Sequence, residues 1–356
     1  MKHGRVLTWD ASLQTLKPPR GVVVLMGPVD SGKSTWVRQY CALYPDADLG
    51  LVSGDLGQCL FGAPGLISYA PWDPRQPDIE QYLPVKCVFV GATHPTGRLL
   101  QTVDAIGRVV RYARHQHGTV LVDTDGLIDD VVGREYKWAL LMNLRPCTVV
   151  LLTAAGTEHP WAALLAPWAD VELFVVEPHG RVRPKPPSER AQRRHQMFQR
   201  WFSDVQRIHV PIDPYLISDC TGLGALVTPP EWDTMHHALG DFLVYAERTP
   251  RKVWVLTREA LPPVTYHRLR EALPQYQVQV HPLPQWRHRL IGDVRPDGYA
   301  SGMGRIVGWS AWPPMLEIEG RFQPSPGPLW VVGPATFPEV SKFPRQDPGC
   351  RMGDAG

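Results

Sequence analysis

Residues 27–34, Gly-Pro-Val-Asp-Ser-Gly-Lys-Ser, match the pattern G-x-x-x-x-G-K-[ST] of a phosphate-binding loop, or P-loop. The apolar run at residues 21–26 predicts a buried parallel strand directly before this loop, and residues 34–44 predict a helix directly after it. A strand, a Gly-rich loop and a helix in this order form the setting in which such a loop wraps around phosphate groups. The pattern therefore predicts an α/β domain of the P-loop NTPase class, built on a doubly wound parallel sheet.

The residue types of the loop fit the binding of ATP and Mg²⁺. Glycine lets the backbone approach phosphate oxygens closely, and the N-terminus of the following helix adds N–H donors for an anion. We expect the Lys33 ammonium to reach the β- and γ-phosphates and the Ser34 hydroxyl to bind Mg²⁺. No Asn-Lys-x-Asp guanine signature follows in the sequence, which favours ATP over GTP. The predicted ATP-binding residues are Gly27, Asp30, Ser31, Gly32, Lys33, Ser34 and Thr35.

The chain divides into two halves of different character. Up to about residue 204, strand and helix patterns alternate, as in a parallel sheet with helices on both faces. The Gly-, Pro- and aromatic-rich segment 59–83 breaks this rhythm and predicts an insertion or lobe beside the site. Short β-like runs dominate afterwards, with helices near 230–246 and 264–272. The predicted division is a P-loop domain at 1–204, a smaller β-rich C-terminal domain at 205–340 and a flexible tail at 341–356.

Composition excludes several classes of protein. The formal net charge is only +2, so any recognition of nucleic acid depends on a local patch. The six cysteines form no C-x-x-C pair, which argues against a zinc site and a disulfide framework. Residues 1–20 lack the apolar core of a signal peptide, and no apolar run reaches the roughly 18 residues that span a bilayer. We therefore expect a cytoplasmic protein that does not contact a membrane.

Two aspartates follow predicted strands, where ligands bind in doubly wound sheets. Asp55 lies at the tip of the predicted strand 49–53, and it either serves as a base or Mg²⁺ ligand or caps its own Gly-rich turn. Asp123 ends the apolar run 119–122 in the manner of a Walker B strand, so it is a predicted Mg²⁺ ligand. Thr124 and Gly126 are then expected to border the phosphate site.

The most basic stretch is residues 181–202. Between residues 180 and 200 it holds seven Lys or Arg and one Glu. With Ser188 as the predicted N-cap of a helix, Arg190 and Arg194 share one helical face. This face either closes over a triphosphate as a lid, holds a nucleic-acid backbone, or is a solvated basic surface. His94 follows another predicted strand and either contacts substrate or is simply an exposed loop histidine.

Taken together, these residues resemble the polynucleotide 5′-hydroxyl kinase family. Its members include the kinase subunit of the eukaryotic pre-mRNA cleavage factor, a ribosomal-RNA processing kinase and prokaryotic relatives. The resemblance rests on Gly-Pro-x-Asp-x-Gly-Lys-Ser-Thr at 27–35, Asp-x-x-Gln at 55–58, a "clasp" at 124–127 and the lid pair Arg190 and Arg194. Leu127 departs from the family pattern, because a tryptophan ends the clasp of the relatives.

The resemblance implies transfer of the γ-phosphate of ATP to the 5′-hydroxyl end of RNA or DNA, in RNA processing or nucleic-acid repair. It makes Lys33, Asp55, Arg190 and Arg194 the catalytic set, and Gln58, His94, Thr124 and Gly126 the substrate and clasp set. Ser34, Asp55 and Asp123 become the metal ligands, with Asp55 as either base or ligand. The short segment before the P-loop favours a prokaryotic stand-alone member. Two alternatives remain: a kinase of a nucleoside or other small alcohol, and a non-catalytic ATP-binding scaffold of RNA processing.

Overall fold

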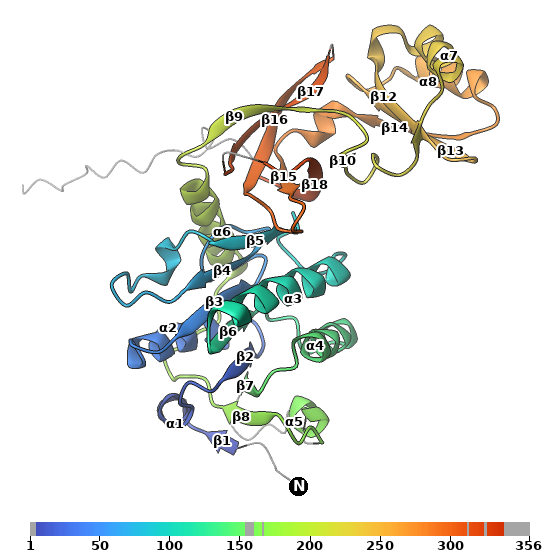
Figure 1. Ribbon diagram of the computed structural model, residues 1–356. Helices are drawn as coiled ribbons and strands as arrows, with labels where there is room; N and C mark the ends of the chain where they lie inside the picture. The colour runs from blue at the N-terminus through green and yellow to red at the C-terminus, as the bar shows by residue number, and fades with distance from the viewer. Residues whose placement is uncertain (1–4, 154–159, 166, 312, 324–325, 338–356) are drawn as a thin grey trace, which may run out of the picture.

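The structure, a computed structural model, describes residues 5–153, 160–165, 167–311, 313–323 and 326–337 (Figure 1). Within these residues the chain forms an eight-stranded, a six-stranded and a four-stranded sheet, here called sheets A, B and C. Sheet A lies in the lower body of Figure 1, sheet B lies above it, and sheet C extends to one side. The tail predicted at 341–356 falls outside the described residues.

Sheet A carries the P-loop near its centre. In spatial order its strands are β1 (Arg5–Leu7), β8 (Glu172–Val176), β7 (Thr148–Leu152), β2 (Gly21–Met26), β6 (Thr119–Thr124), β3 (Leu49–Gly54), β4 (Leu66–Pro71) and β5 (Lys86–Phe89). From β1 to β3 all neighbours in this order are parallel. The carboxyl ends of β2, β6 and β3 therefore lie side by side at one edge of the sheet, where the chain order reverses.

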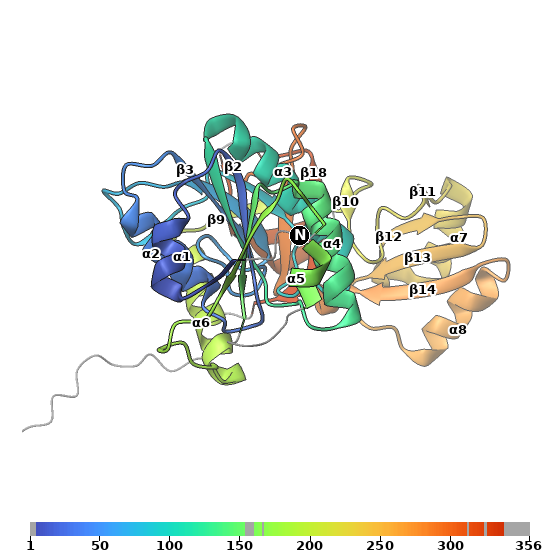
Figure 2. The same ribbon diagram turned by 90° about the horizontal axis from the view of Figure 1, so that it is seen from below.

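Helices cover both faces of sheet A (Figure 2). Helices α1 (Trp9–Thr15) and α2 (Lys33–Leu43) lie on one face, and α3 (Leu99–Gln116), α4 (Val131–Leu144) and α5 (Pro160–Leu165) lie on the other. Strand β2 is buried on both sides because its residues alternate between the two cores: Val22 and Val24 face α3 and α4, whereas Val23 and Leu25 face α1 and α2. The expected doubly wound α/β fold is confirmed.

One expectation about segment 59–83 is wrong. Residues 66–71 form β4, which pairs antiparallel with both β3 and β5, so they belong to the sheet rather than to a lobe beside it. Leu66, Ile67 and Tyr69 are buried there. Residues 59–65 before β4 are mostly buried, whereas residues 72–83 after it are largely exposed and include the short helix η1 (Ile79–Gln81). An antiparallel strand near the edge of an otherwise parallel sheet is common in this class of fold.

The second half of the chain builds two sheets, where one β-rich unit was expected. Sheet B contains β10 (Leu216–Ile217), β18 (Leu329–Thr336), β15 (Arg289–Val294), β16 (Met303–Ala311), β17 (Pro314–Arg321) and β9 (Gln206–Pro211). Sheet C contains β11 (Ala225–Leu226), β12 (Leu243–Arg248), β13 (Lys252–Thr257) and β14 (Gln277–Pro282). Helices α7 (Pro229–Leu239) and α8 (Pro263–Ala272) pack on sheet C, and η2 (Gly240–Phe242) and η3 (Leu283–Trp286) are short connections.

The helix expected at 230–246 is therefore too long. It ends at Leu239, where Gly240 takes a φ of 54°, and residues 243–248 form β12 instead. Glycine adopts positive φ at little cost, which makes it a usual helix terminator. The boundary at residue 204/205 between a P-loop domain and a C-terminal domain stays a prediction.

Helix α6 (Pro187–Trp201) connects sheets A and B. Its C-terminal end packs in a core shared by both halves of the chain, with Leu66 from β4, Leu290 from β15 and Phe337. Its first residue is Pro187 and its N-cap is Pro186, so the prediction of Ser188 as N-cap is wrong. Proline is well suited to the first helical turn because the N–H that it lacks has no partner there.

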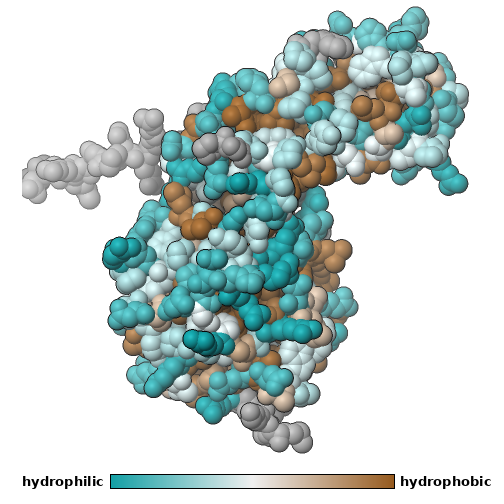
Figure 3. All heavy atoms as spheres, viewed as in Figure 1, coloured by the Kyte–Doolittle hydropathy of each residue, from teal (hydrophilic) through white to brown (hydrophobic). Residues whose placement is uncertain are grey.

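On the face shown in Figure 3, hydrophilic residues cover most of the lower body, and hydrophobic residues are more frequent in the upper part. Within the described ranges, no helix combines the length and the apolar character needed to cross a bilayer.

Candidate active site

A cavity of about 420 Å³ opens at the carboxyl ends of β2, β6 and β3. Four parts of the chain line it: the P-loop with the start of α2, the turn after β3, the turn after β6, and residues between 179 and 193. Lys33, Ser34, Asp55, Thr124 and Gly126, all predicted from the sequence, are among its lining residues. Chain segments far apart in the sequence therefore meet where a doubly wound sheet binds its ligand.

The P-loop has the backbone of an anion cradle. Gly27 has a φ of 150°, and a Cβ there would lie 2.5 Å from the carbonyl oxygen of Leu152. Asp30 has a φ of 60° and Gly32 a φ of 95°. Such left-handed residues turn successive N–H groups toward one point, at the N-terminus of α2. The side chain of Lys33 lies inside this loop, where its Nζ donates to the carbonyl oxygens of Gly27 at 2.9 Å and Pro28 at 2.8 Å.

Ser34 and Asp123 form the second part of the site. The Ser34 hydroxyl donates to Asp123 Oδ2 at 2.6 Å, while Oδ1 of the same carboxylate is buried without a hydrogen-bond partner in the described structure. Asp123 is only 2% exposed, and this burial raises its pKa to about 6, although the Ser34 hydrogen bond and Lys33 oppose the shift. A buried carboxylate oxygen without a partner, beside a serine hydroxyl, fits a divalent cation.

Among the described residues, no group of three His, Cys, Asp or Glu side chains could hold a metal ion by itself. Mg²⁺ usually binds one or two protein side chains and takes its other ligands from water and substrate phosphates. The donors that fit it here are Ser34 and Asp123.

Asp55 follows β3 and lines the cavity. Its Oδ1 accepts hydrogen bonds from the backbone N–H groups of Gly57 at 2.8 Å and Gln58 at 2.9 Å, so it caps its own turn. These bonds occupy one of the two carboxylate oxygens, and a role of Oδ2 in the cavity is compatible with them. The Gln58 side chain lines the cavity as well, and its Nε2 donates to the Arg190 carbonyl at 3.0 Å.

The clasp residues contact strand β2 and the P-loop. Thr124 is buried, and its hydroxyl donates to the Leu25 carbonyl at 2.7 Å. A Cβ on Gly126 would lie 2.5 Å from the backbone nitrogen of Val29, so only glycine allows this close approach. The clasp thus packs against the loop that would hold the phosphates.

The lid region is attached to the P-loop. Arg190 Nη1 donates to Asp30 Oδ2 at 3.0 Å and to the Lys185 carbonyl at 2.7 Å, and the Lys185 N–H donates to Asp30 Oδ2 at 2.9 Å. Arg194 is half-buried and, like Arg190, is not among the residues that line the cavity, whereas Arg193 is. His94 is exposed and does not line the cavity either. The catalytic roles of the two lid arginines and the substrate role of His94 stay predictions.

Comparison with known proteins identifies the family. Residues 27–204 match the family model described as "mRNA cleavage and polyadenylation factor CLP1 P-loop". The chain belongs to this CLP1 P-loop family. The match covers the P-loop, both aspartate turns and the lid helix α6, and it confirms the family resemblance seen in the sequence.

Two curated relatives are polyribonucleotide 5′-hydroxyl-kinases. The protein of Thermococcus kodakarensis is 28% identical over 191 residues, which cover 52% of this chain and 52% of the relative. That of Methanocaldococcus jannaschii is 23% identical over 199 residues, covering 55% of this chain and 54% of the relative. The match thus spans about half the length of these relatives. The solved complex of wild-type Clp1p with a Pcf11p fragment superposes with a TM-score of 0.58 at 14% identity, over 89% of this chain and 74% of that chain.

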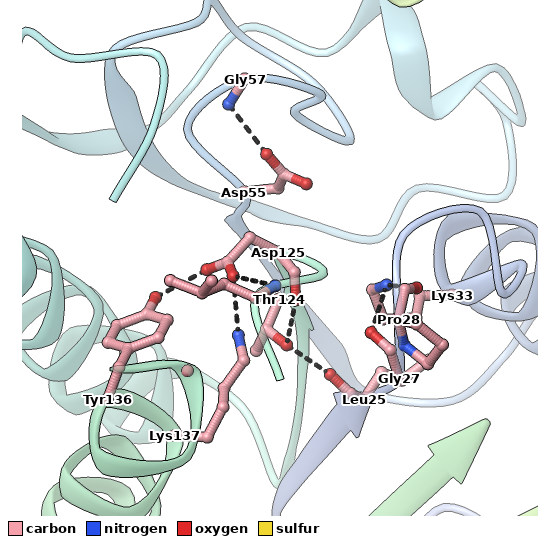
Figure 4. Close-up of polar contacts among 12 residues, drawn as sticks. Leu25, Gly27, Pro28, Lys33, Asp55, Gly57, Thr124, Asp125, Tyr136 and Lys137 are labelled. Atoms are coloured by element: carbon pink, nitrogen blue, oxygen red, sulfur yellow. Dashed lines mark hydrogen bonds and ion pairs between the residues drawn. The ribbon is translucent and has the colours of Figure 1, made fainter. Parts of the chain in front are cut away.

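One buried ion pair of this CLP1 P-loop site is not predicted from the sequence (Figure 4). Lys137, on α4, is fully buried, and its Nζ lies 3.1 Å from Oδ1 of Asp125 in the clasp. The Tyr136 hydroxyl donates to Asp125 Oδ2 at 2.7 Å, and the Leu127 N–H donates to Oδ1 at 2.9 Å. Burial lowers the pKa of Lys137, and Asp125 opposes this shift. Nothing in the sequence distinguishes Lys137 from a surface lysine on an amphipathic helix.

Proposed function

We propose that the chain is an ATP-dependent polynucleotide 5′-hydroxyl kinase, which transfers the γ-phosphate of ATP to the 5′-hydroxyl end of RNA or DNA. The observation that carries the proposal is the convergence of Lys33, Ser34 and Asp55 on one cavity at the switch point of sheet A, with Asp123 hydrogen-bonded to Ser34. Membership of the CLP1 P-loop family and distant homology to two polyribonucleotide 5′-hydroxyl-kinases support it.

In this proposal the P-loop binds the triphosphate. The N–H groups of the loop and the N-terminus of α2 hold phosphate oxygens. Lys33 exchanges its bonds to Gly27 and Pro28 for bonds to the β- and γ-phosphates, where its charge stabilises the transition state. Ser34, Thr35 and Asp123 would hold Mg²⁺, which neutralises charge on the phosphate oxygens when it is bound.

The acceptor enters on the side of Asp55. The Asp55 carboxylate removes the proton of the 5′-hydroxyl as this oxygen forms a bond to the γ-phosphorus, and the bond between that phosphorus and the β–γ bridging oxygen breaks to release ADP. Gln58 orients the acceptor, and Thr124 and Gly126 border it. His94 contacts it from outside the cavity wall.

The lid acts at the triphosphate. Arg190 and Arg194 turn toward the γ-phosphate when nucleotide is bound, and Arg190 then leaves Asp30. We assign the reaction to a domain at 1–204, with residues 205–340 as a separate C-terminal domain.

The test is transfer of label from γ-labelled ATP to matched RNA and DNA strands with a 5′-hydroxyl. We expect labelling of these strands, none of 5′-phosphorylated controls, and loss of labelling in Lys33→Ala. Equal labelling of both kinds of strand end, or undiminished labelling by Lys33→Ala, would reject the kinase. ATP binding without any labelling would favour a non-catalytic scaffold.

Asp55→Asn separates the roles of this carboxylate. If Asp55 is the base, kcat falls by roughly 10²- to 10⁴-fold with the KM for ATP nearly unchanged. A rise in the KM for ATP as the main effect would make Asp55 a metal ligand instead. Raising the salt concentration distinguishes the acceptor class, since binding of a polynucleotide weakens steeply with salt and binding of a neutral nucleoside does not.

A further inference from the structure

Three charged side chains from three separate segments meet at the cavity. Arg38 lies on α2, Glu80 on η1 and Arg193 on α6. Arg38 Nη2 lies 2.6 Å and Arg193 Nη2 lies 2.9 Å from the same oxygen, Oε1 of Glu80. Both arginines line the cavity, with side chains only 30% and 24% exposed. None of the three was singled out from the sequence.

Glu80 is itself held in place. Its carbonyl accepts a hydrogen bond from Arg200 Nη1 at 2.7 Å, and its N–H donates to Asp78 Oδ1, the cap of η1, at 3.2 Å. Hydrogen bonds on both sides of its backbone therefore position Glu80 between the two arginines.

The charges of this cluster do not cancel. Two guanidinium groups share a single carboxylate oxygen, so these three side chains together carry a net charge of +1. Each bond to Glu80 uses one of the five N–H donors of a guanidinium, so the group retains donors for a further anion. Burial lowers the pKa of Arg38, and Glu80 opposes this shift. A half-buried site with excess positive charge and planar donors matches a phosphate group.

The two arginines of the cluster lie on α2, which follows the P-loop, and on α6. Arg38 is one helical turn beyond Ser34 on the same face of α2, and Ser34 binds Asp123. Arg193 is on the helix that the Gln58 side chain contacts through the Arg190 carbonyl.

Gln39, the next residue of α2 after Arg38, also lines the cavity. There Gln39 lies beside Trp9, which donates to its side-chain oxygen, and His179 and Val182 complete the wall. The neighbours Arg38 and Gln39 on α2 thus bind different partners, Glu80 and Trp9.

We propose that Arg38 and Arg193 bind the phosphate on the 3′ side of the terminal nucleotide, so that the site selects strand ends over free nucleosides. This inference rests on the proposed kinase function and names its acceptor more closely. Glu80 keeps the two guanidiniums apart and oriented until the phosphate binds. Since RNA and DNA share this phosphate, the site accepts both.

The experiment compares adenosine with adenosine 3′-monophosphate as acceptors at saturating ATP. They differ only in the phosphate in question, and the measured quantity is the ratio of their kcat/KM values. For wild type we expect the phosphorylated acceptor to be favoured by roughly 10- to 100-fold, as one or two charge-assisted hydrogen bonds would give. Arg38→Gln and Arg193→Gln should each reduce this ratio to within a few-fold of one.

The matched control is Arg75→Gln. Arg75 belongs to the same chain segment as Glu80, but its side chain is 88% exposed and pairs with Asp73 outside the cavity. It should keep the wild-type ratio. Because Arg38→Gln leaves Glu80 with fewer partners, the double variant Arg38→Gln/Glu80→Gln is measured too and should also show the low ratio.

A wild-type ratio near one, or a ratio unchanged in both arginine variants, overturns the inference. So does an equal loss with both acceptors, which would mean that the arginines serve ATP. A binding measurement distinguishes failure of the phosphate-site inference from failure of the kinase function. The affinity of a 5′-hydroxyl oligonucleotide should fall in each arginine variant, and the salt slope of binding should fall by about one, whether or not the oligonucleotide becomes labelled. Unchanged affinity and slope refute the phosphate site.

Discussion

The buried pair of Lys137 and Asp125 predicts a large loss of stability when one partner is removed. Lys137 is fully buried and the Asp125 side chain is 7% exposed, so water compensates neither charge. In Lys137→Met the Asp125 carboxylate keeps its hydrogen bonds from Tyr136 and Leu127 but loses its counter-charge. A carboxylate left without its buried partner destabilises the fold strongly.

The magnitude follows from the separation of the charges. At 3.1 Å and an effective dielectric constant of about 20, the Coulomb energy of the pair is on the order of 5 kcal/mol. Removing one partner of a buried pair typically costs about 3–5 kcal/mol, and the two remaining hydrogen bonds favour the lower end. About 3 kcal/mol corresponds to a fall in Tm of roughly 6–12 °C for a domain of this size.

Thermal denaturation of four proteins tests this reasoning: wild type, Lys137→Met, Asp125→Asn and the double variant. Asparagine keeps the shape of Asp125 and its bond to the Leu127 N–H, so the double variant contains no unpaired charge. It should be more stable than the sum of the two single changes predicts, with a coupling energy of about 2 kcal/mol. A fall in Tm below about 2 °C for Lys137→Met, or additive effects, would refute the ion-pair account.

Two further predictions concern Asp123 and Phe337. The pKa of Asp123, about 6, lies above its ordinary value of 3.8. The contribution of the protonated carboxyl to folding stability is therefore fully present below about pH 4 and is lost as the pH rises through 6. Asp123→Asn should therefore stabilise the magnesium-free protein by about 3 kcal/mol more at pH 8 than at pH 4, and equal Tm differences at both pH values would contradict this. Phe337 stacks on Phe198 at the buried end of α6, with ring centroids 4.6 Å apart. Phe337→Ala should lower the free energy of unfolding by about 3 kcal/mol and raise the KM for ATP. A lowered Tm with an unchanged KM would show that α6 keeps its place without this ring.

The sequence predicts those parts of the fold that depend on local pattern. The apolar strand β2, the P-loop and the Walker B strand ending at Asp123 each carry their signal within a few neighbouring residues. Strand β4 carries no such signal, because residues 66–71 lie in a Gly- and Pro-rich segment and become a strand only by pairing with β3 and β5. The division of the second half into sheets B and C likewise depends on pairing between distant strands.

In the site, the sequence likewise does not predict which way individual side chains point. Helical spacing places Arg190 and Arg194 on one face, but it does not say how the helix is rotated about its axis. That rotation depends on the aromatic core at the far end of α6, and it turns Arg193 toward the cavity and Arg190 toward Asp30. Lys137 is hidden from sequence reasoning for a related reason, since its partner Asp125 comes from a different element.

Helix α6 joins the two halves of the molecule mechanically. From Trp201, which donates to the Met303 carbonyl in sheet B, to Arg190 beside the P-loop, it extends about 16 Å at 1.5 Å per residue. A tilt of about 5° about the Trp201 end displaces Arg190 by about 1.4 Å, which is enough to break its 3.0 Å bond to Asp30. A slight swing of sheet B is thereby transmitted to the mouth of the triphosphate pocket.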